Sequence, residues 1–190
     1  MKKAKTILIF VSGNGSNMSN LISHFDSRSD VSIEAVFSNK EKCLAVENAQ
    51  KAGVNTVSFN KEELENGRVE ELASLLNPDL IVLAGFLLKI PKSLTVTFQN
   101  KIINVHPALL PKFGGKGMYG KHVHKAVIEA GESKSGITFH YVNEHYDEGN
   151  IIAQFDCLVS PTDSWKDLQA KIQNLERENF TEVIDQLLAE

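Results

Sequence analysis

The sequence predicts an α/β protein built on a doubly wound, mostly parallel, twisted sheet, as a single domain over residues 1–190. Three observations support this prediction. Short apolar runs without polar alternation recur along the chain, and such runs are typical of strands buried on both faces of a parallel sheet. Segments with apolar residues at helical spacing separate these runs. The composition, 42% hydrophobic and 23% charged, is that of an ordinary globular protein.

The first expected unit is a strand, a glycine turn and a helix. The apolar run at residues 6–11 leads directly into the turn 12–17, which has the sequence Ser-Gly-Asn-Gly-Ser-Asn. Apolar residues then recur at helical spacing over 18–25, so this helix begins directly after the turn.

The same alternation continues through the next eighty residues. We expect strands at 33–38, 56–59, 80–84 and 102–105, and helices at 43–52, 61–76 and within 92–99. Gly53 ends the first of these helices, and Asn77-Pro78 stops the second. The apolar face of the second helix is expected to be Leu64, Leu72, Leu75 and Leu76. Strands that alternate with helices indicate βαβ units.

After His106 the pattern changes. Residues 107–121 contain four glycines and few apolar anchors, so we expect a loop, followed by a helix at 122–130. Apolar runs at 137–142 and 151–159 predict two strands that extend the sheet in antiparallel fashion. The last segment, 164–188, is expected to be a long amphipathic helix or a helix pair.

The composition disfavours several classes of protein. The formal net charge of −4 argues against a nucleic-acid surface, which needs clustered lysine and arginine. The apolar run near the N-terminus is too short for a signal peptide or a membrane span, so we expect a cytoplasmic protein. Cys43 and Cys157 lack metal-site or disulfide spacing and are expected to be reduced thiols. No HExxH-like cluster occurs, so we expect no metal.

The glycine turn is suited to holding a phosphate. Gly13 and Gly15 allow close backbone approach at the positive end of the helix dipole. A dinucleotide fingerprint would need glycine where Met18 stands and an acid where Ser38 ends the second strand. We therefore expect a single-phosphate cradle, with an empty tight turn as the alternative. Its polar members are Asn14, Ser16 and Asn17.

Three polar residues form a candidate catalytic set. Asn104 and His106 are two apart in an expected strand, so their side chains face the same side at its carboxyl end. A carboxamide and an imidazole aimed at one point could stabilise an oxyanion and move a proton. Asp147, in the expected loop 143–150, could pair with His106 and favour the charged imidazolium. The alternative is a structural histidine and a solvent-facing aspartate.

Four segments together resemble those of the glycinamide ribonucleotide formyltransferases. They are the turn 12–17, Leu83-Ala84-Gly85-Phe86, the string Asn104-Val105-His106-Pro107-Ala108-Leu109-Leu110-Pro111, and the segment with Asp147 before Ile151-Ile152. The resemblance spans nearly the whole chain. It implies a Rossmann-like formyltransferase fold and transfer of the formyl group of 10-formyltetrahydrofolate to the amine of 5′-phosphoribosylglycinamide in de novo purine biosynthesis.

The resemblance also implies roles for individual residues. Asn104 would hold the formyl oxygen and His106 would be the general acid. Asp147 would keep His106 protonated and order a water. The substrate phosphate would bind at Gly13, Asn14, Gly15, Ser16 and Asn17, and its sugar at Gln173 and Glu176.

The folate would bind between two segments. The backbone of Leu87, Leu88, Lys89 and Ile90 would face the pterin, with Asn143, Glu144, His145, Tyr146 and Asp147 closing on its other side, next to Asn104. The sequence departs from the family at Leu88, where an arginine is common, and at Arg177, where a histidine is usual. For the folate tail, Lys61, Arg68 or neither remains open.

Other functions share parts of this pattern. A deformylase that hydrolyses 10-formyltetrahydrofolate has the same catalytic chemistry but carries an extra N-terminal regulatory domain. A methionyl-tRNA formyltransferase adds a C-terminal nucleic-acid-binding domain, and a non-catalytic nucleotide-binding module would not need the polar set. We expect small-molecule substrates only, no membrane, and a monomer or homodimer. The glycine-rich loop 114–122, which looks longer than in many members, is expected to be either a lid or a mobile surface loop.

Overall fold

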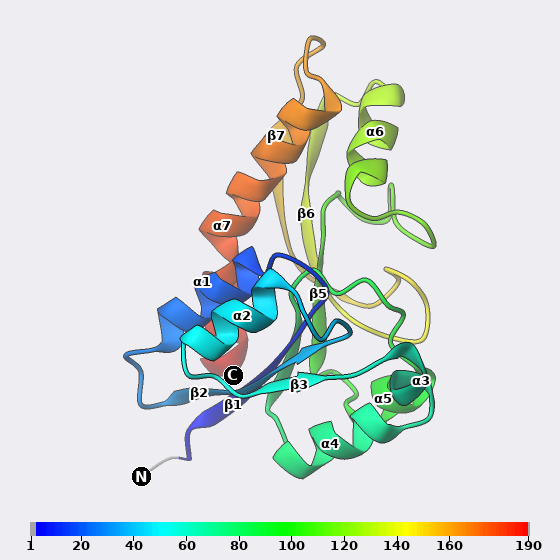
Figure 1. Ribbon diagram of the computed structural model, residues 1–190. Coiled ribbons are helices and arrows are strands. Elements are labelled where there is room, and N and C mark those ends of the chain that lie inside the picture. The colour runs from blue at the N-terminus through cyan, green and yellow to red at the C-terminus, as the bar shows by residue number, and fades with distance from the viewer. Residues whose placement is uncertain (1–2, 190) are drawn as a thin grey trace.

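Seven strands form one mixed sheet through the middle of the molecule (Figure 1). The computed structural model describes residues 3–189. The strand order is β3-β2-β1-β4-β5-β6-β7, in which β1 to β5 pair in parallel and β6 and β7 are antiparallel additions. The strands are β1 (Lys5–Val11), β2 (Val31–Ser38), β3 (Thr56–Ser58), β4 (Leu80–Leu83), β5 (Ile102–His106), β6 (Lys134–Tyr141) and β7 (Ile151–Leu158). The expected mostly parallel α/β sheet is confirmed.

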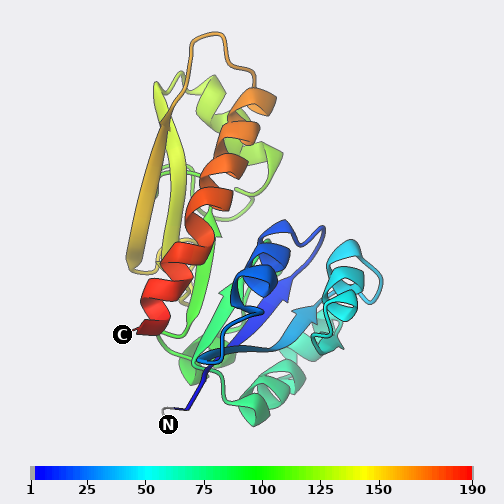
Figure 2. The same ribbon diagram turned by 90° about the vertical axis from the view of Figure 1, so that its left-hand side faces the viewer.

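Helices cover both faces of this sheet. One face carries α1 (Ser16–Phe25), α2 (Leu44–Lys51), α6 (Lys121–Glu129) and α7 (Trp165–Ala189). The other carries α3 (Lys61–Glu65), α4 (Arg68–Leu76) and α5 (Lys92–Thr97). Figure 2 shows α7, a single uninterrupted helix, lying lengthwise against the β6–β7 part of the sheet.

The central strand β1 shows why the apolar runs predicted a doubly covered sheet. Ile7, Ile9 and Val11 belong to the core under α1, α2 and α7, whereas Leu8 and Phe10 belong to the core over α3 to α5. Alternate side chains of a strand point to opposite faces, so a strand buried on both faces must be apolar at every position.

The helix expected at 61–76 is wrong as a single helix. It is two helices, because Asn66 and Gly67 interrupt it and Gly67 has a φ of 91°. Glycine adopts this left-handed conformation without steric penalty, and a turn forms there. Asn60 begins the first helix with a reciprocal side-chain and backbone cap to Glu63, a feature that stabilises helix starts.

The expected apolar face of that segment is also partly wrong. Leu64 is buried, but Leu75 is 76% exposed and Leu76 is 38% exposed. The interruption changes the rotational phase of α4, so Val69 and Ala73 face the core instead.

The other helix and strand boundaries predicted from the sequence agree with those of the structure to within one to three residues. In the part of the chain that the structure describes, no helix is both long enough and apolar enough to cross a membrane.

Candidate active site

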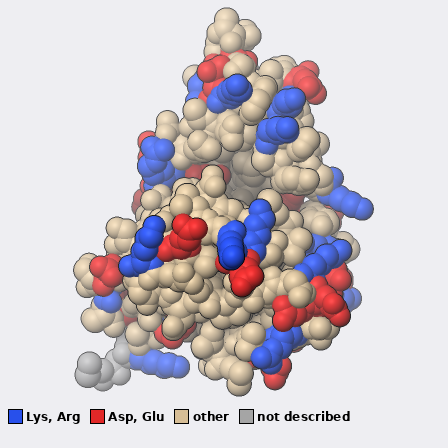
Figure 3. Space-filling model, viewed as in Figure 1, with Lys and Arg blue, Asp and Glu red and all other residues tan. Residues whose placement is uncertain are grey.

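A cavity of about 320 Å³ opens at the carboxyl ends of β4 and β5. Its walls come from residues 83–90, 104–107, the glycine-rich loop at 115–120, the β6–β7 connection at 142–147, and α7. In Figure 3 the viewed face is hollowed between the upper part of the molecule, which holds α6, and the lower part. Open α/β sheets place ligands at this edge, as the sequence led us to expect.

The orientation of Asn104 is set by a histidine on the neighbouring strand. Asn104 in β5 and His140 in β6 are directly opposite partners in the antiparallel ladder. His140 Nδ1 lies 3.0 Å from the carbonyl oxygen of Tyr141, which can only accept, so Nδ1 carries the proton of the neutral ring. His140 Nε2 is then the acceptor for the Asn104 amide nitrogen at 3.2 Å. One amide N–H of Asn104 is used in this way, and the other is left for a ligand.

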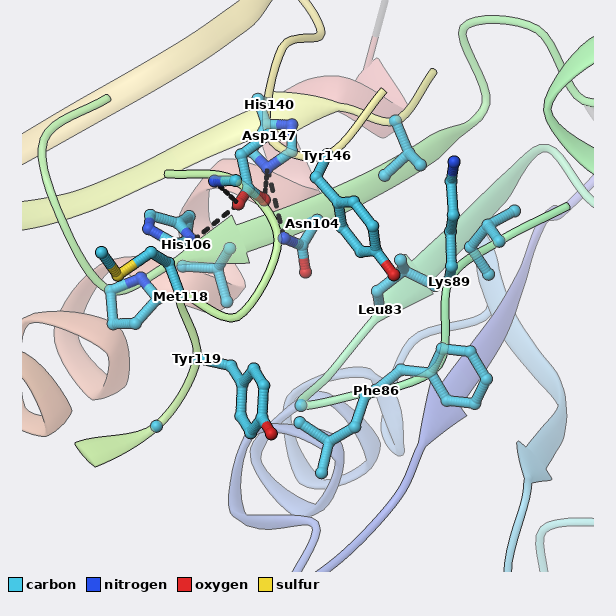
Figure 4. Close-up of a pocket in the computed structure, with 18 of the residues that line it drawn as sticks. Leu83, Phe86, Lys89, Asn104, His106, Met118, Tyr119, His140, Tyr146 and Asp147 are labelled. Atoms are coloured by element: carbon cyan, nitrogen blue, oxygen red, sulfur yellow. Dashed lines mark hydrogen bonds and ion pairs between the residues drawn. The ribbon is translucent and has the colours of Figure 1, made fainter. Parts of the chain in front are cut away.

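His106 and Asp147 meet as the sequence predicted (Figure 4). His106 Nδ1 lies 3.5 Å from Asp147 Oδ2, and His106 Nε2 lies 2.8 Å from the carbonyl oxygen of Phe113. Asp147 Oδ2 also accepts the Gly115 backbone N–H at 2.9 Å, and its Oδ1 lies 3.6 Å from His140 Nε2. Asp147 therefore touches both histidines and the glycine-rich loop.

The surroundings of His106 do not favour the charged state that we expected for it. Burial lowers the pKa of His106 below its ordinary value, because the ring is only 3% exposed. Asp147 and the Phe113 carbonyl both favour the charged ring and raise the pKa, but they offset the burial only in part. Near neutral pH the ring is therefore neutral, with the Nε2–H donated to Phe113 and Nδ1 free to accept a proton.

Two further histidines in this cavity have a lowered pKa. Burial is the main cause for His140 and for His124 of α6, and the nearby His106 lowers both further. Neither histidine is among the site residues predicted from the sequence. The Nδ1 of His124 is buried without a hydrogen-bond partner among the described residues.

The glycine turn precedes α1 as expected, but its two glycines serve different purposes. Gly15 has a φ of 74°, and a Cβ there would lie 2.6 Å from the Ala45 side chain. Gly15 is thus required for packing against α2. At Gly13 a Cβ would meet no atom within 4 Å, so this position faces open space. A substitution that tests how closely a phosphate approaches the backbone is therefore better made at Gly13 than at Gly15.

The turn joins the cavity through Asn17. Its amide donates to Glu176 Oε2 of α7 at 2.8 Å, and both residues line the cavity with Gln173. Burial raises the pKa of Glu176, and the bond from Asn17 opposes this shift only in part. Asn14 and Ser16 are exposed at the N-terminal end of α1, where backbone N–H groups have no intrahelical partners.

The two expected folate segments face each other across the cavity. Leu87, Leu88, Lys89 and Ile90 line one side, and Asn143, His145, Tyr146 and Asp147 line the other. Glu144 lies outside this cavity and pairs instead with Lys92 at 2.7 Å. The Leu87 N–H donates to Ser12 Oγ at 2.9 Å, so the backbone donors left for a ligand on this segment are those after Leu87.

Neither cation expected for the folate tail lies in this cavity. Lys61 pairs with Glu65 and Arg68 pairs with Glu71, both on the surface of the α3–α4 region. Within residues 3–189 no group of three or more His, Cys, Asp or Glu side chains is arranged to hold a metal.

The formyl transferase family matches residues 5–184. The chain is 37% identical to the chloroplastic phosphoribosylglycinamide formyltransferase of Arabidopsis thaliana, and the match covers 99% of this chain and 67% of the plant protein. It is 33% identical to the phosphoribosylglycinamide formyltransferase of Bacillus subtilis, over 97% of this chain and 95% of that protein.

A solved structure has the same architecture. The crystal structure of phosphoribosylglycinamide formyltransferase from Anaplasma phagocytophilum matches with a TM-score of 0.89 at 28% identity, over 98% of this chain and 88% of that one.

Proposed function

Because the chain belongs to the formyl transferase family, we propose that it transfers the formyl group of 10-formyltetrahydrofolate to the amine of 5′-phosphoribosylglycinamide, in de novo purine biosynthesis. The observation that carries the proposal is the meeting of Asn104, His106 and Asp147 in one cavity that also reaches the glycine turn through Asn17.

Asn104 is placed to stabilise the transition state. As the substrate amine attacks the formyl carbon, the formyl oxygen becomes negative and needs a hydrogen-bond donor. The N–H of Asn104 that His140 does not use is such a donor, and it carries no charge that would have to be buried.

The His106–Asp147 pair moves one proton between the two substrates. The neutral ring of His106 can take the proton that the attacking amine must lose. The resulting imidazolium donates to acceptors at both nitrogens, the Asp147 carboxylate and the Phe113 carbonyl. The same proton then goes to the folate nitrogen as its bond to the formyl carbon breaks, which leaves His106 neutral again. No external acid or base is consumed.

The remaining parts of the cavity bind the substrates. We propose that Gly13, Asn14, Gly15, Ser16 and Asn17 hold the phosphate and that Gln173 and Glu176 hold the sugar. The segments at 87–90 and 143–147 hold the folate. Co-substrate binding needs no metal in this scheme.

The proposal is tested by supplying 10-formyltetrahydrofolate with and without phosphoribosylglycinamide. We expect tetrahydrofolate and formylated product only when the acceptor is present. The matched variant Asn104→Ala should lower kcat by roughly 100- to 1,000-fold, the usual effect of losing one oxyanion donor. Formate release that does not depend on the acceptor would indicate a deformylase instead, and no reaction in either arm would exclude both activities.

We further propose that the protein acts in the cytoplasm, on small molecules alone, as a monomer or homodimer. The net charge of −4 supports the absence of a nucleic-acid partner. Cell fractionation tests the cytoplasmic location, and sedimentation of the purified protein tests whether it is a monomer or a homodimer. Recovery with an organelle, as the names of the plant relatives indicate for those proteins, would contradict the first.

A further inference from the structure

The backbone that follows β5 is held by two polar side chains of the β6–β7 hairpin. Thr138 of β6 is fully buried, and its hydroxyl donates to the carbonyl oxygen of Ala108 at 2.7 Å. The same hydroxyl accepts the Leu110 N–H at 3.0 Å and an amide N–H of Gln154 at 2.9 Å. The Gln154 amide nitrogen also donates to the Leu110 carbonyl at 3.0 Å. A hydroxyl has one donor and two acceptor sites, so the whole hydrogen-bonding capacity of Thr138 is used here.

This network lies beside the catalytic strand without touching the catalytic ring. Thr138 is directly opposite His106 in the antiparallel β5–β6 ladder, so the two side chains stand on the same face of the sheet. The hydroxyl, however, is used on the backbone of residues 108–110, and Thr138 is not among the residues that line the cavity. Any effect of Thr138 on His106 must therefore pass through this backbone.

The held backbone is packed against Asp147. At Gly114 an added Cβ would lie 2.6 Å from Cδ2 of Leu110 and 3.2 Å from Cβ of Asp147. The chain at Gly114 thus runs between Leu110 and Asp147 with no room for a side chain. A shift of Leu110, whose N–H and carbonyl are both bound by the hairpin, would displace this part of the chain.

The residues on either side of Gly114 make the contacts that hold the catalytic pair. The carbonyl oxygen of Phe113 accepts from His106 Nε2 at 2.8 Å. The backbone N–H of Gly115 donates to Asp147 at 2.9 Å. The position of the backbone at 113–115 therefore sets one contact to each member of the pair.

We infer that the Thr138 hydroxyl positions the His106–Asp147 pair for proton transfer, through the backbone at 108–115. Gln154 supports it from the next strand. The inference rests on the proposed function, in which His106 moves the proton. A buried polar network with every member bonded is rigid, and a catalytic group is held in its productive geometry by such supporting contacts. Thr138 is thus a positioning residue that touches no reacting atom.

The main test is Thr138→Val, which exchanges the hydroxyl for a methyl group of similar size. We expect kcat to fall roughly 10- to 100-fold, as a small misplacement of a catalytic group can cause, with both KM values near those of the wild type. Movement of the Phe113 carbonyl away from His106 removes a hydrogen bond that raises the pKa of the ring, so the acidic limb of the kcat profile should move to lower pH. Thr138→Ser, which keeps the hydroxyl, should retain the wild-type rate and profile.

Two further variants separate positioning from folding. Ser135→Ala is the matched control, because Ser135 is a buried β6 hydroxyl that has no hydrogen-bond partner among the described residues. It should leave kcat and the pH profile unchanged. Gln154→Met removes support from the exposed strand β7 without emptying a buried site, and it should shift kcat and the profile in the same direction by less.

NMR titration of the His106 ring measures its pKa without turnover. We expect a lower pKa in Thr138→Val and Gln154→Met and the wild-type value in Ser135→Ala. An unchanged His106 pKa and an unchanged pH profile in the folded variants would overturn the inference, even with a lowered melting temperature, because the network would then only stabilise the fold. Absence of formyl transfer by the wild type would contradict the proposed function, while the titration would still show whether the network positions the ring.

Discussion

The position of the Asn104 side-chain amide depends on the register between β5 and β6. Asn104 and His140 face each other because β5 and β6 are antiparallel, and the tautomer of His140 then determines which end of the amide turns toward it. His140 is thus a positioning residue: it orients the donor without touching the reacting atoms.

Replacement of His140 by Phe keeps a ring in the core but removes the acceptor for Asn104. We expect kcat to fall by roughly 10- to 100-fold, as a small misplacement of a catalytic group can cause. Both KM values should stay near those of the wild type, because neither binding segment is changed. A KM increase that matched the fall in kcat would indicate that His140 supports binding instead. His140→Asn, which can still accept a hydrogen bond, is the conservative variant and should recover part of the rate.

The two glycines of the phosphate turn can be separated experimentally. At Gly13 the new Cβ of Gly13→Val meets no protein atom within 4 Å, so we expect the substitution to act mainly on a bound ligand. We expect a large rise in the KM of phosphoribosylglycinamide, an unchanged KM for the folate and an unchanged melting temperature. Gly15→Ala, which combines a close contact to Ala45 with an unfavourable φ, should instead lower the melting temperature. An unaffected KM in Gly13→Val would show that phosphate binds elsewhere.

At the scale of elements, the glycine-rich loop between β5 and α6 is the part most closely tied to the site. Gly115, Gly117, Met118, Tyr119 and Gly120 line the cavity. The base of the loop is anchored because the Phe113 carbonyl accepts from His106 and the Gly115 N–H donates to Asp147. The stretch at 116–120 beyond these anchors is held by few hydrogen bonds, which run within the loop itself.

We therefore expect 116–120 to close over bound substrate while its base stays fixed. Amide hydrogen exchange at these residues should be fast in the free protein and slow when both substrate analogues are bound. Exchange at Gly115 should be slow in both states and serves as the internal control. Fast exchange at 116–120 in both states would show a permanently mobile surface loop.

The sequence predicts the elements that depend on local pattern and misses those that depend on tertiary context. Apolar runs identify β1 to β5, and the spacing of Asn104 and His106 places both at one cavity. The break at Gly67 is missed because the apolar spacing continues across it. His140 cannot be paired with Asn104 from sequence because the pairing needs the β5–β6 register. The burial of His106, which lowers its pKa and opposes the effect of Asp147, has no signature in the sequence.

At the scale of the whole molecule, three buried histidines make stability depend on pH. The pKa values of His106, His124 and His140 are lowered by burial, so between those values and about 6.5 the unfolded chain binds more protons than the folded one. The stability that these three histidines contribute is fully present above the unfolded pKa of about 6.5, and it is lost as the pH falls through this window. Glu176 acts in the opposite direction, since its raised pKa adds stability as the pH falls.

The three histidines lower the stability as the pH falls, and only Glu176 raises it. We therefore expect the urea midpoint to be lower at pH 5.5 than at pH 7.5. The aspartates with lowered pKa, such as Asp79 and Asp185, titrate below this window and do not contribute. The decline should be steeper in Glu176→Gln and shallower in His140→Phe. A midpoint that stayed constant, or rose, toward pH 5.5 would contradict the lowered histidine pKa values.

The pH profile of kcat for Asp147→Asn tests the proton transfer by His106 and Asp147 most directly. The variant keeps an oxygen for the Gly115 N–H but loses the charge that raises the pKa of His106. We predict a strongly lowered kcat, little change in the binding of either substrate, and an acidic limb displaced to lower pH, because the ring then loses its proton at lower pH. In His106→Ala that limb should be absent. A near-normal kcat with an unchanged profile in Asp147→Asn would contradict the mechanism.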